Sequence, residues 1–375
     1  MERVVILGGG FAGLAAANVL GDRRSVQCIL VDQRETFDFL PMIPDVVGGR
    51  IDGDLLLCRH DYLADRLGFT FCHGAVTEVD LAARRVVTGN SSLDYDYLII
   101  ASGTQANFFD RPDVREHAYA VESVAGARRL HRALLDCRTV VVCGGGYTGV
   151  EVATNVRALF SRAGCGAGIV LVERDDALVS HLPPWLRDYV KNNVEEMDID
   201  VRLGTTVASV DGRNVTLQGG QTITDAILVW SAGVQTAPYV RRLPVPKSET
   251  GGRLKVDSCL RVDRTCFAAG DVAGFVHRGR HLRMSVQFSI SQGRCAAHNV
   301  LAVVARGPLR PFRPFDPGYL VPMANGRSGG KVLGLTVWGL PATLLHYFVS
   351  IVRSCGWTNR LGLLKQLLSG RLTRT

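Results

Sequence analysis

Two glycine-rich turns in this chain have the residue types and spacing that bind the pyrophosphate of a dinucleotide. Both follow the pattern Gly-X-Gly-X-X-Gly, with glycines at Gly8, Gly10, Gly13, Gly144, Gly146 and Gly149. The first glycine of such a pattern makes a tight turn, the second lets the backbone approach the pyrophosphate, and the third lets a helix pack closely on a strand. The N-terminus of that helix favours an anion. The sequence therefore predicts two dinucleotide sites in one chain.

Each turn is followed by an acidic residue at the end of the next expected strand. Asp32 lies nineteen residues after Gly13, and Glu173 lies twenty-four residues after Gly149. A carboxylate at this place accepts hydrogen bonds from an adenosine ribose. Glu173 would repel a 2′-phosphate, which favours NADH. Arg174 beside it could accommodate that phosphate, so NADPH stays open as the alternative.

The elements that must position these residues form two similar units. Each unit reads strand, glycine turn, helix and strand, at residues 3–7, 11–20 and 27–31 and again at residues 139–143, 148–159 and 168–172. A later apolar strand, 95–101, leads into Ser102-Gly103, and its counterpart 226–231 leads into Ala232-Gly233. We therefore expect an α/β fold with two Rossmann-like dinucleotide-binding domains, each a three-layer parallel sheet with an antiparallel extension.

Shorter patterns complete the expected organisation. Residues 37–59 read as irregular. Strands are expected at 67–73, 75–80, 85–87, 200–203, 207–210, 216–217, 254–256 and 266–269, with further short strands within 318–337. Helices are expected at 285–305, 341–352 and 359–372. Asp271, which follows the strand at 266–269, has two compatible interpretations, a helix cap and a ligand of ribityl hydroxyls.

Cysteine usage excludes several kinds of chemistry. The chain has ten cysteines and no Cys-X-X-Cys pair, and Cys58 has no neighbouring cysteine. We expect most of these thiols to be free, buried and structural, as in a reducing compartment.

No metal site is expected, because the nine histidines do not cluster at ligand spacing. We expect no signal peptide, because the first residues lead directly into an apolar strand.

The C-terminal segment has a distinct composition. After Asp316 there is no acidic residue, whereas seven lysines and arginines follow. Residues 332–352 carry no charge, but Gly334, Gly339 and Pro341 interrupt them, so a membrane span is disfavoured. Basic ends and a leucine-rich face predict an interfacial membrane anchor. The leucines could instead pack into the core or a homodimer interface. Nucleic-acid binding is disfavoured by the apolar content.

The order of these motifs resembles the glutathione-reductase-type flavoprotein superfamily over roughly residues 1–300. The resemblance rests on the two glycine turns, Ala101-Ser102-Gly103-Thr104 and Ala269-Gly270-Asp271. It implies FAD on the first unit and NAD(P)H on the second. The implied domains are 1–110 for FAD, 111–250 for NAD(H), 251–315 for FAD again, and 316–375 for membrane association or dimerisation. Without a redox cysteine pair, the disulfide reductases are disfavoured.

Within that superfamily the chain is similar to type II NADH:quinone oxidoreductases. The similarity rests on residues 37–42, on Arg59, on Glu151 after the second turn, and on residues 286–293 with Gln287. Ser291 stands where that family usually has glutamine, so the quinone contact is in doubt. The resemblance implies that Glu151 helps to position the nicotinamide and that Gln287 lies near the quinone.

The resemblance also implies a set of cofactor contacts. Besides the glycines, those for FAD are Phe11, Ala12, Asp32, Gln33, Arg34, Pro41, Val76, Ala101, Ser102, Gly103, Asp271 and Gln287. Those for NADH are Tyr147, Thr148, Glu151, Glu173, Ala232 and Gly233. We expect hydride transfer from NADH to FAD, then reduction of a membrane quinone, by a peripheral protein on the cytoplasmic side of a membrane. Sulfide:quinone oxidoreductases and apoptosis-inducing-factor-like flavoproteins, some of them redox signalling or binding proteins, remain alternatives.

Overall fold

The computed structural model describes residues 1–89, 91–249 and 251–369. The chain forms two compact units, each assembled from three stretches of sequence. Unit 1 contains Met1–Phe37, Cys58–Gln105 and Val234–Asp316. Unit 2 contains Asp38–Leu57, Ala106–Gly233 and the stretch that begins at Pro317. Each unit therefore carries one of the two glycine turns.

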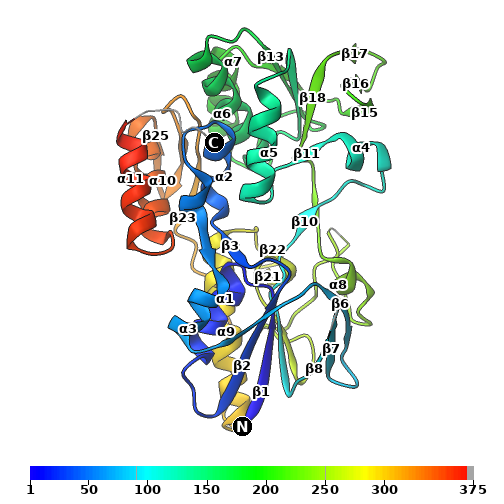
Figure 1. Ribbon diagram of the computed structural model, residues 1–375, viewed down its shortest axis with the longest axis vertical. Helices are drawn as coiled ribbons and strands as arrows, with labels where there is room; N and C mark the ends of the chain where they lie inside the picture. Colours follow the sequence, from blue (N-terminus) through cyan, green and yellow to red (C-terminus); the bar gives the residue numbers. More distant parts are fainter. Residues whose placement is uncertain (90, 250, 370–375) are drawn as a thin grey trace. The chain divides into compact units, whose positions relative to one another are not determined.

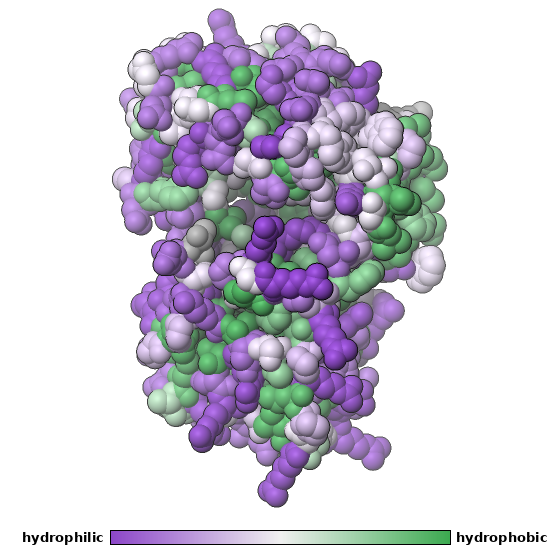
Figure 2. Space-filling view, turned by 180° about the vertical axis from the view of Figure 1, so that it is seen from behind, coloured by the Kyte–Doolittle hydropathy of each residue, from purple (hydrophilic) through white to green (hydrophobic). Residues whose placement is uncertain are grey.

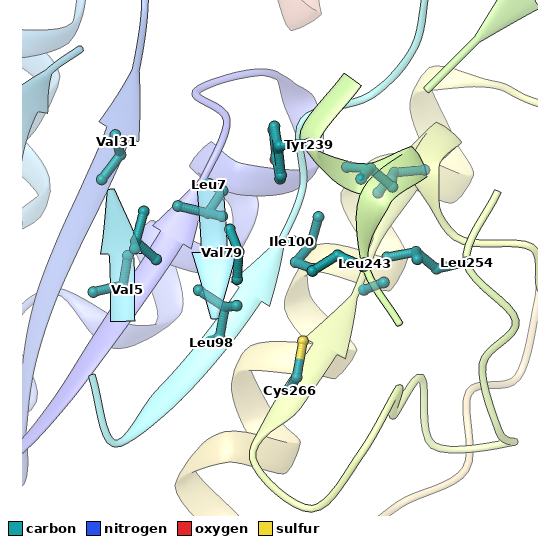
Figure 3. Close-up of a cluster of buried hydrophobic side chains, with 14 of the residues drawn as sticks. Val5, Leu7, Val31, Val79, Leu98, Ile100, Tyr239, Leu243, Leu254 and Cys266 are labelled. Carbon is teal, nitrogen blue, oxygen red and sulfur yellow. The ribbon is translucent and has the colours of Figure 1, made fainter. Parts of the chain in front are cut away.

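Unit 1 is built on a five-stranded sheet in the order β20-β9-β1-β2-β5 (Figure 1). Its strands are β1 (Glu2–Leu7), β2 (Val26–Asp32), β5 (Thr70–His73), β9 (Tyr97–Ile100) and β20 (Cys266–Ala268). All neighbouring pairs run parallel. Such strands are covered on both faces and read as continuous apolar runs. Figure 3 shows the cluster that they bury, which includes Val5, Leu98, Ile100 and Cys266.

Two helices pack tightly on each other in unit 1. These are α1 (Phe11–Leu20), which follows the first glycine turn, and α9 (Val286–Val304). A Cβ on Gly293 of α9 would lie 2.1 Å from the Ala12 carbonyl oxygen, so only glycine permits this approach. The remaining elements of the unit are α3 (His60–Leu67), β6 (Val76–Asp80), β7 (Arg85–Thr88), β8 (Ser92–Asp94), β19 (Val234–Gln235), α8 (Pro238–Arg242), η3 (Gly270–Val272), β21 (Val276–His277) and β22 (Arg280–His281).

Unit 2 repeats this sheet in the order β11-β18-β12-β13-β14. Its strands are β11 (Tyr119–Ala120), β12 (Thr139–Cys143), β13 (Gly168–Val172), β14 (Asp200–Arg202) and β18 (Ala226–Trp230), and all pairs are parallel. Its helices are α2 (Ile43–Val47), α4 (Pro112–His117), α5 (Val124–Leu134), α6 (Tyr147–Ala163) and α7 (Pro184–Glu196), with 3-10 turns η1 (Leu40–Met42) and η2 (Gly53–Leu56). An antiparallel extension is formed by β15 (Val207–Asp211), β16 (Asn214–Leu217) and β17 (Thr222–Ile223).

The end of the chain belongs to unit 2. It forms the antiparallel strands β23 (Gly318–Val321), β24 (Gly329–Val332) and β25 (Leu335–Trp338), then helices α10 (Leu340–Arg353) and α11 (Trp357–Ser369). Three short strands, β3 (Thr36–Asp38), β4 (Leu57–Arg59) and β10 (Gln105–Ala106), lie where the chain passes between units. Among the described residues, no helix is both long and apolar enough to cross a bilayer.

The expected α/β fold with two parallel-sheet cores is confirmed, while several local expectations are wrong. The strand expected from residue 67 starts only at Thr70, because helix α3 runs to Leu67 and Gly68 ends it at φ +71°. The expected strand 254–256 forms only isolated bridges. Residues 37–59 are not irregular, since α2, η1 and η2 lie there. The last helix begins at Trp357, and residues 370–372 of the expected helix lie outside the described part.

The cysteines also depart from expectation at two positions. Cys28, Cys143 and Cys266 are buried free thiols, and burial raises the pKa of the Cys28 thiol to about 12. Cys58 and Cys355, in contrast, are each disulfide-bonded. Sequence spacing could not reveal this, because pairing depends on which cysteines the tertiary structure brings together.

Candidate functional site

The first glycine turn has three glycines with three different surroundings. Gly8 adopts φ +106°, and a Cβ there would lie 2.5 Å from the Ala101 carbonyl oxygen. A Cβ on Gly13 would lie 1.8 Å from the Gly8 carbonyl oxygen. Gly10 differs, because a Cβ there would meet no atom within 4 Å and its φ of −78° suits any residue. The protein itself does not require glycine at Gly10, whereas a closely approaching ligand would.

The second turn reproduces this geometry. Gly144 adopts φ +112°, and a Cβ on Gly149 would lie 1.7 Å from the Gly144 carbonyl oxygen. A Cβ on Gly146 would again meet no atom within 4 Å, at φ −75°. Both units therefore leave an open backbone surface at the N-terminus of the helix that follows, where unpaired N–H groups favour phosphate.

In each unit, the acidic residue that follows the glycine turn accepts a hydrogen bond from a backbone N–H of that turn. Asp32 Oδ2 accepts from the Gly9 N–H at 2.6 Å, and Oδ1 accepts from the Arg34 N–H at 2.8 Å. Glu173 Oε2 accepts from the Gly145 N–H at 2.5 Å. A carboxylate offers about four acceptor positions, so capacity for ribose hydroxyls remains in both units.

A cavity of about 180 Å³ opens beside the first turn within unit 1. Its lining joins the turn to the second strand and to a late segment of the chain: Gly8, Val31, Asp32, Gln33, Arg34, Gly74, Val76, Ser102, Thr104, Gln105, Ala237, Pro238 and Tyr239. The expected residues Asp32, Gln33, Arg34, Val76 and Ser102 are thus brought together around one space.

Two buried hydroxyls in that lining have no hydrogen-bond partner in the described part of the chain other than, at most, each other. They are Ser102 Oγ and Tyr239 OH, which lie beside each other. Tyr239 is 6% exposed, and burial raises the pKa of its phenol above the usual range. Because an unpaired buried hydroxyl costs stability, these groups fit a polar ligand in the cavity. Figure 3 shows Tyr239 beside the ends of the strands that carry Leu7 and Ile100.

Asp271 lies in η3, which packs against α9 in unit 1. Ser289 Oγ donates to Asp271 Oδ1 at 3.4 Å, and Arg253 Nε donates to its carbonyl oxygen at 2.9 Å. Burial raises the pKa of the Asp271 carboxyl, and Arg253 partly offsets this. Next to it, Gln292 Oε1 accepts from the Gly270 N–H at 2.8 Å. Gln292 thus has a structural task in this unit, fixing the turn that presents Asp271.

Gln287, expected near a quinone, lies in the first turn of α9. Its Nε2 donates to Asp316 Oδ1 at 3.3 Å, and Arg283 Nη2 donates to the same oxygen at 2.6 Å. The Gln287 amide keeps its carbonyl oxygen as a potential acceptor. Phe11 of the same unit contacts Phe37 edge to face at 5.0 Å, and Ala12 is buried under Gly270.

The surroundings of the second turn contain the other expected residues. The Tyr147 ring lies 5.4 Å from that of His181, and Thr148 is exposed. Gly233, at φ +75°, follows Ala232 at the end of β18. Pro41 stands in η1, in the segment 38–57 that belongs to unit 2.

Glu151, the fifth residue of α6, has an unusual electrostatic environment. The residue keeps some exposed surface, whereas its carboxyl lies deep among protein atoms. Burial, and then the nearby Asp45 carboxylate, raise the pKa of Glu151 well above its usual range. This environment favours the protonated form of Glu151 over the carboxylate, and a protonated carboxyl can donate a proton as well as a hydrogen bond.

The sequence alone did not indicate which residues lie around Glu151, or which late residue joins the lining of the cavity beside the first glycine turn. Asp45, Arg50, His346 and Tyr347 assemble beside Glu151 from positions up to 302 residues apart. Tyr239 lies 231 positions after Gly8 in the cavity lining. No local pattern marks such residues. Among the described residues there is also no group of three or more His, Cys, Asp or Glu placed to hold a metal ion.

Comparison with known proteins places the chain in a family. A family model described as pyridine nucleotide-disulphide oxidoreductase matches residues 2–293. An NADH dehydrogenase-like protein of Mycobacterium tuberculosis is 33% identical over 354 residues, covering 88% of this chain and 87% of that protein. A demethylphylloquinone reductase of Synechocystis is 27% identical over 382 residues, covering 96% and 94%.

Two further similarities agree with this placement. A type II NADH:quinone oxidoreductase of Haemophilus influenzae is 24% identical over 387 residues, covering 88% of this chain and 87% of that protein. The structure of NDH2 from Plasmodium falciparum in complex with NADH has the same fold, with a TM-score of 0.89 at 16% identity, covering 100% of this chain and 99% of the other. The chain belongs to the pyridine nucleotide-disulphide oxidoreductase family, and its relatives include type II NADH:quinone oxidoreductases.

Proposed function

We propose that this protein is an FAD-dependent NADH:quinone oxidoreductase that works at a membrane surface. The observation that carries the proposal is the pair of open glycines, Gly10 and Gly146, each in a turn built for a dinucleotide. The relatives named as a demethylphylloquinone reductase and as a type II NADH:quinone oxidoreductase supply the direction of the reaction. NADH, a proton and a quinone would be converted to NAD⁺ and quinol.

Unit 1 is the proposed FAD-binding unit. Its cavity, the free capacity of Asp32 and the unpaired hydroxyls of Ser102 and Tyr239 fit the polar groups of that cofactor. Asp271 would hold ribityl hydroxyls, held in turn by Ser289 and Arg253. Bound FAD would supply the ability to accept a hydride and pass on two electrons.

The second turn and its surroundings in unit 2 are the proposed NADH site. Gly146 and the start of α6 would hold the pyrophosphate, and Glu173 the adenosine ribose. NADH is favoured over NADPH because the Glu173 carboxylate would face a 2′-phosphate. The Arg174 side chain is 82% exposed, and its Nε lies 3.9 Å from Asp175 Oδ1, which is too long for a hydrogen bond. NADPH therefore stays open as the alternative. Glu151, as a neutral acid, would donate a hydrogen bond to the nicotinamide or a proton to the quinone.

The C-terminal segment is the proposed membrane contact. Its large exposed side chains are Leu333, Leu335, Trp338, Leu340, Leu344, Phe348, Val352, Trp357, Leu361, Leu364 and Leu368. Figure 2 shows the corresponding hydrophobic area on the right-hand side of that view. Packing of α11 into the core accounts for Leu363, which is fully buried, but not for these residues. Arg353, Arg360 and Lys365 add positive charge at this face.

Exposed apolar surface flanked by basic residues favours an anionic lipid surface. A homodimer through the same face is the competing arrangement. Partition into anionic vesicles should weaken at least about tenfold for Leu344→Ser with Phe348→Ser, since burying each side chain contributes about 1.5–3 kcal/mol. Leu135→Ser, at the C-cap of α5 where the leucine is 68% exposed, is the matched control. Unchanged vesicle binding together with loss of a dimer would identify the dimer interface instead.

The enzymatic proposal is tested in one assay. The purified protein is examined for FAD absorbance, and NADH oxidation is followed with and without a short-chain quinone. We expect bound FAD and stimulation by quinone. Absence of quinone stimulation would refute the quinone-reductase proposal and leave the flavoprotein proposal intact. Flavin reduction by sulfide in place of NADH would identify a sulfide:quinone oxidoreductase, and slow turnover with a long-lived charge-transfer complex would indicate an apoptosis-inducing-factor-like protein.

A further inference from the structure

Beside Glu151, unit 2 contains a buried polar cluster that no sequence motif marks. Asp45 of α2 is 4% exposed, and Tyr347 OH of α10 donates to its Oδ1 at 2.8 Å. Arg50 Nη1 donates to Tyr347 OH at 2.8 Å, so the hydroxyl both donates and accepts. The Arg50 guanidinium also lies over the Tyr347 ring at 4.8 Å and reaches Asp45 Oδ1 at 4.0 Å.

Helix α2 packs against α6, and Asp45 lies near enough to Glu151 for the two carboxyls to interact electrostatically. A Cβ on Gly48 would lie 2.8 Å from Asn155 Oδ1, and Asn155 Nδ2 donates to the Glu151 carbonyl oxygen at 3.0 Å. Further along α6, Arg162 Nη2 donates to the Gly48 carbonyl oxygen at 2.5 Å. Asp45 and Gly48 are three residues apart, and Glu151 and Asn155 four apart, so each pair shares one helix face. The contact at Gly48 therefore fixes where Asp45 stands.

The two carboxyls have opposite surroundings. Burial raises the pKa of Asp45, but Arg50, the Tyr347 hydrogen bond and Arg162 all act to lower it. For Glu151, burial and Asp45 both raise the pKa. Two acids in one buried site do not both ionise, and the one with cationic and hydrogen-bonding partners keeps the charge. The hydrogen bond from Tyr347 and the nearby Arg50 thus favour Asp45 as the carboxylate of the pair and Glu151 as the acid.

Other titratable groups on the packed elements do not reverse this assignment. His346 of α10 is neutral, because burial and then Arg50 lower its pKa to about 4. His131 of α5 is engaged with the Val47 carbonyl oxygen at 2.9 Å. On η2, Asp54 and the preceding Asp52 are both paired with Arg128 at 2.9 Å.

We propose that Asp45, held as a carboxylate by Tyr347 and Arg50, is a positioning residue that keeps Glu151 protonated for quinone reduction. This rests on the proposed function. Reduction of a quinone to a quinol takes two electrons and two protons, of which NADH brings two electrons and one proton as hydride. Glu151 would give its proton to a quinone oxygen, become a carboxylate, and regain a proton from water. The negative charge on Asp45 favours that return.

The first test is infrared titration, which needs no turnover. The carbonyl stretch of a neutral carboxyl is assigned to Glu151 by its loss in Glu151→Gln, and its intensity is followed against pH in the purified holoenzyme. In Asp45→Asn, which keeps an acceptor for Tyr347, the band should disappear at lower pH than in the wild type. Asp45→Glu should restore the wild-type titration. Asp54→Asn, an exposed acid of the same unit, is the matched control and should change nothing.

The second test is the pH profile of quinone reduction. The wild-type kcat should fall as pH rises and Glu151 loses its proton. In Asp45→Asn this fall should begin at lower pH, giving a several-fold lower kcat at alkaline pH, an unchanged kcat at acid pH and an unchanged KM for NADH. Tyr347→Phe should show a smaller change of the same kind.

The possible results separate the two proposals. A Glu151 band that titrates identically in the wild type and Asp45→Asn overturns the role of Asp45. If the band shifts as expected but the wild type reduces no quinone, the proposed function fails while the Asp45–Glu151 coupling stands. If quinone is reduced with the same pH profile in both proteins, the coupling has no part in the reaction and the inference is wrong.

Discussion

The two glycine turns share a backbone geometry, yet the units differ in what surrounds it. In both, the first glycine is left-handed, the third is locked against the first, and the middle one is open. The helix after the first turn carries Ala15 where the second carries Glu151. Around the first turn, Ser102 and Tyr239 enclose a cavity, whereas Ala232 takes the place of Ser102 in the second unit.

This difference fits the two tasks proposed for the two units. A cavity lined by several polar groups suits a cofactor that stays bound, because each satisfied contact slows dissociation. A turn followed by a buried acid with a raised pKa suits a substrate that must enter, react and leave. The backbone supplies the dinucleotide affinity common to both, and the side chains added around it decide residence and chemistry.

The largest effect is expected from filling the open space at the middle glycines. Gly10→Ala should prevent stable FAD binding, and Gly146→Ala should leave FAD bound while raising the KM for NADH at least about tenfold, since a methyl would separate backbone and pyrophosphate. Bound flavin is measured by absorbance and the KM by steady-state kinetics. Gly89→Ala and Gly166→Ala, where a Cβ also meets no atom within 4 Å, are matched controls. Equal effects of both turn substitutions on FAD would contradict the division of tasks.

The next effect concerns the enclosure of the first site. Tyr239→Phe removes a hydroxyl from the cavity and should weaken FAD binding about fivefold, corresponding to the roughly 1 kcal/mol of one hydrogen bond. The measurement is flavin fluorescence during reconstitution of the apoprotein. Tyr95→Phe is a close control, because Tyr95 is also buried in unit 1 with an unpaired hydroxyl, yet does not line the cavity. If the two variants bind FAD alike, the Tyr239 hydroxyl is no cofactor contact.

A smaller effect should appear in the pH dependence of stability, through Glu151 near the second turn. The folded pKa of Glu151 is raised, so between the unfolded value and this raised value the folded state holds more protons than the unfolded state. Stability therefore declines as pH rises through that window. Glu151→Gln cannot titrate, and its melting temperature relative to the wild type should increase with pH. A difference that stays constant from acid to alkaline pH would argue against a buried neutral Glu151.

The smallest effect on stability is expected from His346, whose ring contacts that of Tyr347 in the same buried polar cluster. Its folded pKa is lowered from 6.5 to about 4, so the unfolded state binds more protons between these values. Stability should then fall as pH decreases from about 6.5 toward 4. His346→Gln should flatten that part of the melting-temperature curve. If the melting temperatures of the variant and the wild type fall equally as the pH decreases, the pKa of His346 is not lowered in the folded state.

Much of the candidate site could be predicted from local sequence. The structural roles of Gly8, Gly13 and Asp32 depend on backbone conformation and on contacts within one strand–turn–helix–strand unit. Short-range steric effects produce that geometry wherever the pattern occurs. The same holds for the two sheets, since runs of buried β-branched residues between helices lead to parallel strands. Helix α3 and the short helices within 37–59 were missed because their apolar periodicity is weak over few residues.

The sequence by itself thus determined that the protein has two dinucleotide turns, the residues that shape them, and an acid-free apolar end. Only the tertiary structure decided which distant residues meet them. Tyr347 reaches Asp45 across 302 positions, and Tyr239 joins a cavity that begins at Gly8. Such contacts follow from how sheets and helices pack, and no spacing rule records them. The protonation of Glu151 depends on that packing, because a carboxyl's pKa is set by the burial and charges around it.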